Sequence, residues 1–196
     1  MAQAIIMDFA GTTADQYDRV IENMDLGGEV VDGAIFHVAG PTENGWRVID
    51  VWDDMDKFQK FADEKIGPLT AAEGIPAPQL QFMNVDELID ERGGGDGGIT
   101  HFQVVRLDGL TKEQFGEMDR LVRGENGDPP EGCMFHVNGW TDDGWMVCDG
   151  WTSKDVRDTF LAEKVAPAAQ QTSTPPPTIE DLPVHNTLVA RSQTTA

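Results

Sequence analysis

The spacing of apolar residues divides the chain into short strands and amphipathic helices. Ala4 to Phe9 and His101 to Leu107 are apolar runs of strand length. Each run is followed by a threonine, Thr13 or Thr111, with a glutamine three residues further on, which is the capping-box pattern of a helix start. Beyond each threonine the apolar residues recur at helical spacing. The pattern therefore predicts a strand followed by a helix, at two places in the chain.

A hairpin, a second helix and a last strand are predicted after each of these pairs. In the first half, Ala34–Ala39 and Trp46–Trp52 flank a segment of turn-forming residues. The helix that follows is expected to stop at Pro68, and its counterpart at Pro167, because proline lacks the amide that a helix interior uses. The last strands are expected at Gln79–Val85 and Val184–Val189.

The chain contains this pattern as an internal repeat. GAIFHVAGPTENGWRVIDVW begins at Gly33, and GCMFHVNGWTDDGWMVCDGW begins at Gly132, 99 positions later. The period is far longer than the roughly 20–50 residues of solenoid repeats, so each copy should form a small domain. We expect one repeat over residues 1–90, a glycine-rich linker over 91–98, a second repeat over 99–189 and a frayed tail over 190–196.

The motifs GxxFHVxG, GW-x-V-x-D-x-W and FxxEKxxP, in this order of elements, resemble the dimeric α+β barrel superfamily. Within it, the chain looks most like the antibiotic-biosynthesis-monooxygenase-like domains, and the resemblance covers nearly the whole chain in two copies. It implies an α+β fold in which two ferredoxin-like βαββαβ repeats pair their antiparallel sheets into one intramolecular barrel. The protein would then be a monomeric pseudo-dimer, and further homodimerisation stays open. The superfamily includes cofactor-free monooxygenases, haem-degrading enzymes, isomerases and stress proteins, so fold analogy alone does not choose among functions.

We expect no cofactor and no metal. Haem-binding relatives offer an axial histidine from a helix, and neither Asp54–Gly67 nor Lys154–Ala166 contains one. Cofactor-free relatives use Trp, Asn, Tyr or Arg in a cleft, which the tryptophans match in kind. The four histidines lack the close spacing of metal ligands.

His37 and His136 occupy equivalent positions on the predicted strands and are the candidate catalytic bases. A half-buried imidazole suits the removal of a proton from a phenol or an acidic C–H group. Packing in the core is the more common role of such a histidine. Asp50 and Asp149 lie between tryptophan and valine on one strand face, where a carboxylate must find a donor. Each Asp would orient the His across the hairpin if the register pairs them, and would otherwise bind loop amides.

The tryptophans are candidate walls of a ligand pocket. Trp46, Trp52, Trp145 and Trp151 share the strand face of the aspartates, and could hold a flat apolar ligand or serve as ordinary core. Trp140 falls in the predicted turn and could gate the cleft. Arg47 and Tyr17, both in the first repeat, complete the candidate substrate-binding set.

Charge and cysteine content exclude several classes of partner. The chain has 14 Lys and Arg against 35 Asp and Glu, a net charge of −21, so binding to nucleic acid or an anionic membrane is not expected. The N-terminus has no signal-peptide pattern. Cys133 and Cys148 form no CxxC motif and lack the spacing of metal ligands. A cytoplasmic protein with free thiols is the expectation.

Three hypotheses follow for the function, one of which is a purely structural pseudo-dimer whose enzymatic ancestry has been lost. The first is a small-molecule enzyme that carries out cofactor-independent monooxygenation or proton transfer on an aromatic or polyketide-like substrate. The alternative is a non-catalytic protein that binds a hydrophobic ligand or acts in stress response. A cleft holding His and Asp within hydrogen-bond reach would favour the first hypothesis.

Overall fold

The computed structural model describes residues 1–93 and 95–188, which form two compact units. Unit 1 contains Met1–Asn84 and, of the later chain, residues 95–96 and 182–188. Unit 2 contains Val85–Gly93 and Gly97–Asp181. Each unit therefore includes a piece of chain from the end of the other repeat. The predicted tail at 190–196 lies outside the described residues.

Unit 1 has the βαββαβ order of a ferredoxin-like unit with one added strand. Its elements are β1 (Gln3–Ala10), α1 (Ala14–Met24), β2 (Ala34–Thr42), β3 (Gly45–Trp52), α2 (Met55–Phe61), the π-helical turn η1 (Ala62–Ile66), α3 (Gly67–Ala72), the first half of β4 (Gln79–Asp90) and β9 (Asn186–Leu188). The antiparallel strand order is β4–β1–β3–β2–β9.

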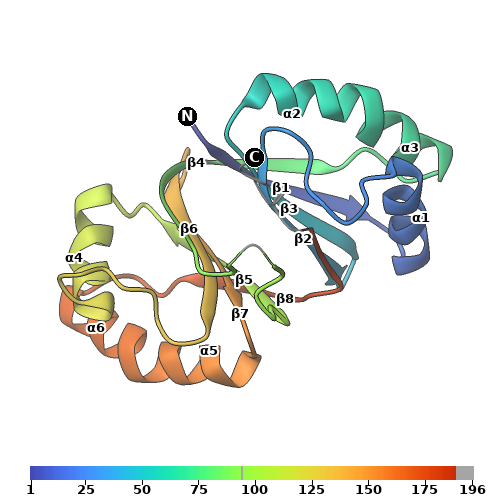
Figure 1. The fold of residues 1–196 in the computed structure, drawn as a ribbon. Helices are drawn as coiled ribbons and strands as arrows, with labels where there is room; N and C mark the ends of the chain where they lie inside the picture. Colours follow the sequence, from blue (N-terminus) through green and yellow to red (C-terminus); the bar gives the residue numbers. More distant parts are fainter. Residues whose placement is uncertain (94, 189–196) are drawn as a thin grey trace, which may run out of the picture. The chain divides into compact units, whose positions relative to one another are not determined.

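Unit 2 has the same order of elements. They are β5 (His101–Asp108), α4 (Lys112–Arg123), β6 (Cys133–Thr141), β7 (Gly144–Trp151), α5 (Lys154–Phe160), the π-helical turn η2 (Leu161–Val165), α6 (Ala166–Thr172) and most of β8 (Thr178–Pro183). Its strand order is β8–β5–β7–β6–β4, in which the second half of β4 takes the place that β9 has in unit 1. Figure 1 shows the helices and strands of each unit.

The helix starts confirm the capping predictions. Thr13 and Thr111 each form a complete capping box with the glutamine three residues on, and Ser153 caps α5 through a hydrogen bond from the Val156 amide to its hydroxyl. These contacts satisfy amides that the first turn of a helix leaves without partners.

The prediction that Pro68 and Pro167 stop the second helix of each repeat is wrong. Each helix continues beyond its proline, to Ala72 in unit 1 and to Thr172 in unit 2. In η1 the Gly67 amide bonds the carbonyl of Ala62, five residues earlier, and η2 has the same form. The wider turn accommodates a residue that has no amide hydrogen and would crowd the preceding turn of a regular helix.

The last strands also differ from the prediction. β4 runs on from the expected end at Val85 to Asp90, because its second half pairs in unit 2. Near the C-terminus, the single expected strand Val184–Val189 is replaced by β8 and β9, with Pro183 ending the first of them. Val189 lies outside the described residues.

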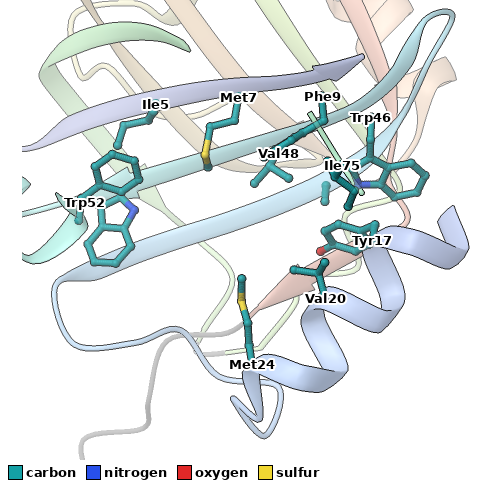
Figure 2. Packing of buried hydrophobic residues seen from close by; sticks show 12 residues of the cluster. Ile5, Met7, Phe9, Tyr17, Val20, Met24, Trp46, Val48, Trp52 and Ile75 are labelled. Carbon is teal, nitrogen blue, oxygen red and sulfur yellow. The ribbon is translucent and has the colours of Figure 1, made fainter. Parts of the chain in front are cut away.

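The core of unit 1 fills the space between the sheet and its helices (Figure 2). Alternate side chains of β1 and β3 point to the face of the sheet that the helices cover, among them Met7, Val48 and Trp52. Val20 and Met24 of α1 reach toward them from the other side. The apolar side chains that alternate along the strands thus pack against those at helical spacing on α1 and form one apolar layer. Within the described residues, no helix combines the length and apolarity needed to span a membrane.

Replacing Gly40 with alanine is expected to destabilise unit 1 by about 1–3 kcal/mol. Gly40 lies in β2, and a Cβ atom there would stand 2.0 Å from the Pro183 carbonyl oxygen and 3.1 Å from Leu182. Urea unfolding measures the change. Gly116→Ala is the control, because that exposed α4 position is open and alanine stabilises a helix by about 0.5–1 kcal/mol over glycine. Equal stability of Gly40→Ala and the native protein would contradict the close approach.

Candidate functional site

The hairpin register places each candidate histidine directly opposite its aspartate. His37 pairs with Asp50 across β2 and β3, and His136 pairs with Asp149 across β6 and β7. In both units the His Nδ1 lies 2.7 Å from an aspartate oxygen, and both side chains are buried. Because a carboxylate only accepts hydrogen bonds, Nδ1 carries the hydrogen in each pair. The register that the sequence left open thus brings the four candidate residues together as two His–Asp pairs.

In unit 1, a buried chain of hydrogen bonds ends on the His37–Asp50 pair. The Tyr17 hydroxyl lies 2.9 Å from His37 Nε2, and Asn186 Nδ2 donates to the same hydroxyl at 2.9 Å. Burial raises the pKa of the Tyr17 phenol well above its ordinary value, so the phenol keeps its hydrogen at neutral pH. The chain of donors therefore runs from Asn186 to Tyr17, from Tyr17 to Nε2, and from Nδ1 to Asp50.

Three of these four side chains, those of Tyr17, His37 and Asp50, line an apolar cavity of about 60 Å³ in unit 1. Trp46 and Trp52 form part of its wall, together with Tyr17, His37 and Asp50. The Trp46 ring stacks on Tyr17 at 5.0 Å between centroids, and Trp52 Nε1 donates to the second oxygen of Asp50 at 3.4 Å. A space of this size accepts more than one water molecule and is enclosed mostly by hydrocarbon.

In unit 2, the histidine lies between two carboxylates. Besides Asp149, His136 Nε2 faces Glu87 at 3.6 Å and the Asn138 amide nitrogen at 2.9 Å. Burial opposes the charged ring, but hydrogen bonds and attraction from Asp149 and Glu87 outweigh it and raise the pKa of His136 to about 9. The raised pKa favours the protonated ring, whereas the Asn138 amide nitrogen 2.9 Å from Nε2 is a donor and bonds the ring form that keeps a lone pair there.

Glu87 is held by a second cation as well. Its carboxylate accepts from Arg123 Nη2 at 2.6 Å and from Asn138 Nδ2 at 3.0 Å. The contact with His136, and secondarily the hydrogen bond from Arg123, lowers the pKa of Glu87 to about 2 against the cost of its partial burial. Arg123 in turn holds Asp119 through a bidentate pair. The charges around His136 are thus paired with one another.

Unit 2 also replaces apolar neighbours of the aspartate by polar ones. Gln103 on β5 donates to the second oxygen of Asp149 at 2.7 Å, and Arg157 on α5 donates to the Gln103 oxygen at 3.2 Å. The equivalent positions in unit 1 are Ile5, which also stands opposite the aspartate, and Phe58. Phe115 stands where unit 1 has Tyr17, so unit 2 has no phenol on its histidine.

The stability of unit 2 is expected to fall as pH rises from about 6.5 to about 9. The folded-state pKa of His136 lies above its ordinary value of 6.5, so the folded protein binds the proton more tightly than the unfolded chain. The resulting stabilisation is complete below about 6.5 and is lost as pH rises through about 9. Urea unfolding at a series of pH values measures it, and His136→Gln should flatten the profile over this range. An unchanged profile in that variant would contradict the assignment.

Two further candidate residues lie away from the cavities. Arg47 projects from β3 between Trp46 and Val48 and makes a bidentate pair with Asp8 of β1, at 2.7 and 2.9 Å, instead of lining the pocket. The prediction that Trp140 lies in a turn is wrong, because β6 continues to Thr141. Its ring is 37% exposed and lies 6.4 Å from that of Trp145, along a shallow surface depression.

The sequence analysis did not find the residues that β9 and the second half of β4 contribute. Asn186 of β9 completes the chain on Tyr17, and Glu87 of β4 completes the surroundings of His136. The two positions are 99 apart, so extending the repeat alignment to the last strand would have paired them. His185 also borders the unit 1 site: it bonds Asp18 at 2.7 Å and lies edge-on to Trp46, 5.0 Å between centroids.

Comparison with known proteins identifies the fold. No family model matches the sequence, and no curated protein matches it. Among solved structures, a protein from Fusobacterium nucleatum named as a candidate monooxygenase has a TM-score of 0.70 at 12% identity, over 96% of this chain and 94% of that one. A similarly named protein from Lactobacillus acidophilus has a TM-score of 0.67 at 9% identity, over 96% and 95%. An anthrone oxidase-like protein has a TM-score of 0.55 at 16% identity, over 100% and 95%.

The chain has the α+β fold of these solved structures, with an antiparallel sheet and the βαββαβ order of elements in each unit. Each unit is one ferredoxin-like half of that fold, as the internal repeat predicted. The pairing of the two units into one barrel stays a prediction.

The expectation that this protein binds no haem stays a prediction. The four histidines here lie on β2, β5, β6 and directly before β9, so no helix presents one. Among the described residues there is also no cluster of His, Cys, Asp and Glu suited to a metal ion.

Proposed function

We propose that this protein is a small-molecule enzyme and that the cavity of unit 1 carries its reaction. The observation that supports this is the Asn186–Tyr17–His37–Asp50 chain, whose phenol and imidazole line an apolar cavity. His37 acts as the base, Asp50 orients the ring and stabilises the imidazolium that forms, and Trp46 and Trp52 hold a flat apolar substrate.

The Tyr17 hydroxyl gives the proton a path to the base. It donates to His37 Nε2, so a substrate proton can pass to the Tyr17 oxygen while the phenol proton passes to Nε2. The raised pKa of Tyr17 opposes a free phenolate, which favours the two transfers occurring together. The positive charge then lies on His37, 2.7 Å from Asp50.

The substrate class that suits this site is a flat carbon acid or phenol, and dioxygen is the co-reactant that would oxidise its anion. Overall, a CH₂ group and O₂ give a C=O group and water, one oxygen atom entering each product. No cofactor takes part in this proposal. The likeness to an anthrone oxidase-like protein and to candidate monooxygenases supports the choice of chemistry.

The alternative is a protein that binds an apolar ligand in this cavity without changing it. The fact that Tyr17, His37 and Asp50 already satisfy one another favours it. Anthrone in air-saturated buffer separates the two, with anthraquinone measured by chromatography and oxygen consumption by an electrode. The enzyme should form anthraquinone faster than buffer does, with one O₂ consumed per product. Saturable binding of anthrone with no gain in rate would support the alternative.

A further inference from the structure

Unit 2 has a groove of about 710 Å³ between the loop that joins α4 to β6 and the segment formed by α5 and η2. Part of its wall is apolar, with Val122, Pro130, Val156 and Phe160. Val156 is 37% exposed and, like Glu131, lines this groove but not the smaller cavity next to His136. The volume lies within the roughly 300–1,000 Å³ of small-molecule sites, so the groove is large enough for a ligand.

The internal repeat shows which side chain fills the equivalent place in unit 1. Val156 corresponds to Lys57, 99 positions earlier, and each lies against a glycine of the preceding loop. A Cβ atom on Gly33 would stand 2.6 Å from Lys57 Cδ, and one on Gly132 would stand 2.7 Å from Val156 Cγ1. Lys57 and Val156 therefore cover the same backbone position, but the valine lacks the outer atoms of the lysine.

This difference leaves a carboxylate of unit 2 without its cation. In unit 1, Lys57 Nζ lies 2.9 Å from a carboxylate oxygen of Asp32. Glu131 corresponds to Asp32 and lines the groove, and no Lys, Arg or His side chain of the described residues pairs with it. The groove thus keeps the acidic half of the unit 1 ion pair and has lost the ammonium half.

The other charges at the groove wall also favour a cation. Asp128 and Glu163 add two carboxylates to that of Glu131. Lys164 adds one ammonium, whereas Arg123 is already held by two carboxylates that lie outside the groove lining. The carboxylates therefore outnumber the cations left to balance them, and an anionic ligand is disfavoured.

We propose that this groove binds a small molecule that carries a primary ammonium group on an apolar body. The ammonium takes the place of Lys57 Nζ and donates to the Glu131 carboxylate. The apolar body lies against Val156 and Phe160, as the stem of a lysine would. The site lies within unit 2 and does not depend on the reaction proposed for the unit 1 cavity.

Two probes of equal length test the ammonium contact. 4-Phenylbutylamine is a cation at neutral pH, and 4-phenylbutan-1-ol has a neutral hydroxyl group in place of the amine. Each is titrated into the ¹⁵N-labelled full chain at about 0.15 M salt, which screens exposed charges beyond about 8 Å. The amide signals of Gly132 and Thr159, observed by NMR, report on this groove. We expect the amine to bind about fivefold more tightly than the alcohol, the upper range for an exposed ion pair.

Two variants assign this preference to the incomplete ion pair, each with a control of the same charge change. Glu131→Gln removes the carboxylate, so the amine should bind no better than the alcohol. Glu125→Gln, in the same loop but outside the groove lining, should keep the preference. Val156→Lys introduces the lysine of unit 1, which should pair with Glu131 and abolish the preference. Gln170→Lys, at an exposed position of α6, should keep it.

The proposal fails if neither amide responds to the amine up to its solubility limit. It also fails if the two probes bind the native protein equally well, which would make the groove a site for neutral apolar molecules. Retention of the full preference in either Glu131→Gln or Val156→Lys would contradict it too. Both substitutions are at exposed positions, and unit 1 already has lysine at the place of Val156. None of these outcomes depends on whether anthrone is oxidised.

Discussion

Replacing His37 with glutamine should lower the rate of anthrone oxidation by roughly 10²–10⁴-fold, the contribution usual for a general base. The same change at His136 should leave the rate within about twofold. The two histidines have equivalent positions and the same 2.7 Å bond to an aspartate, but only His136 lies between two carboxylates that raise its pKa to about 9. A ring whose raised pKa favours its protonated form is less able to take up a substrate proton at neutral pH.

The His136→Gln variant is the matched control for His37→Gln, since each removes one buried imidazole from the same strand position. Thermal unfolding of both variants shows whether a loss of rate reflects a loss of fold. Tyr17→Phe adds a test of the proton path: it keeps the ring that stacks on Trp46 and removes the hydroxyl, so kcat should fall more than KM rises. Equal losses in the two histidine variants would place the chemistry outside unit 1 or in both units.

Replacing Asp149 with leucine should destabilise unit 2 by about 3–5 kcal/mol, the largest effect on stability that we expect. Asp149 is buried and accepts from His136 Nδ1 and Gln103 Nε2, both at 2.7 Å. Its loss would leave the His136 Nδ1–H group and the Gln103 amide without their acceptor in an apolar interior, which costs more than the leucine gains by its apolar contacts. The pKa of His136 should fall in the same variant, because one of the two carboxylates that raise it is gone.

Amide hydrogen exchange on β7 measures this destabilisation within unit 2 itself. The control is Lys154→Ala, which removes a surface ion pair: Lys154 lies 2.7 Å from Asp158, and both side chains are about half exposed. That change should cost less than about 1 kcal/mol. A similar small cost for Asp149→Leu would show that the buried network around His136 does not stabilise the unit.

Much of the fold could be predicted from the sequence because its local signals agree. The threonine–glutamine spacing located both capped helices, and the alternation around Trp46–Trp52 located the hairpin strand. The helix ends predicted from the prolines were wrong, because Pro68 and Pro167 lie just after π-helical turns. The i to i+5 hydrogen bonding of such a turn cannot be recognised from the sequence.

The site was harder to predict than the elements that carry it. His37 and Asp50 could be named from their residue types, but their contact depended on a register that a one-residue slip would have changed. The different surroundings of the two histidines were not predictable from the motif, which is the same in both repeats. They depend on Glu87, Gln103 and Arg157, which lie on other elements and come together only in the folded unit.

The placement of β9 and of the second half of β4 means that the effects of mutations should not follow the repeat boundaries of the gene. Glu87 is encoded with the first repeat and serves the histidine of unit 2, while Asn186 is encoded with the second and serves the tyrosine of unit 1. In a saturation mutagenesis screen, tolerance at Glu87 should therefore resemble tolerance at His136, and tolerance at Asn186 should resemble that at Tyr17. Each unit therefore depends on one residue that is encoded in the other repeat.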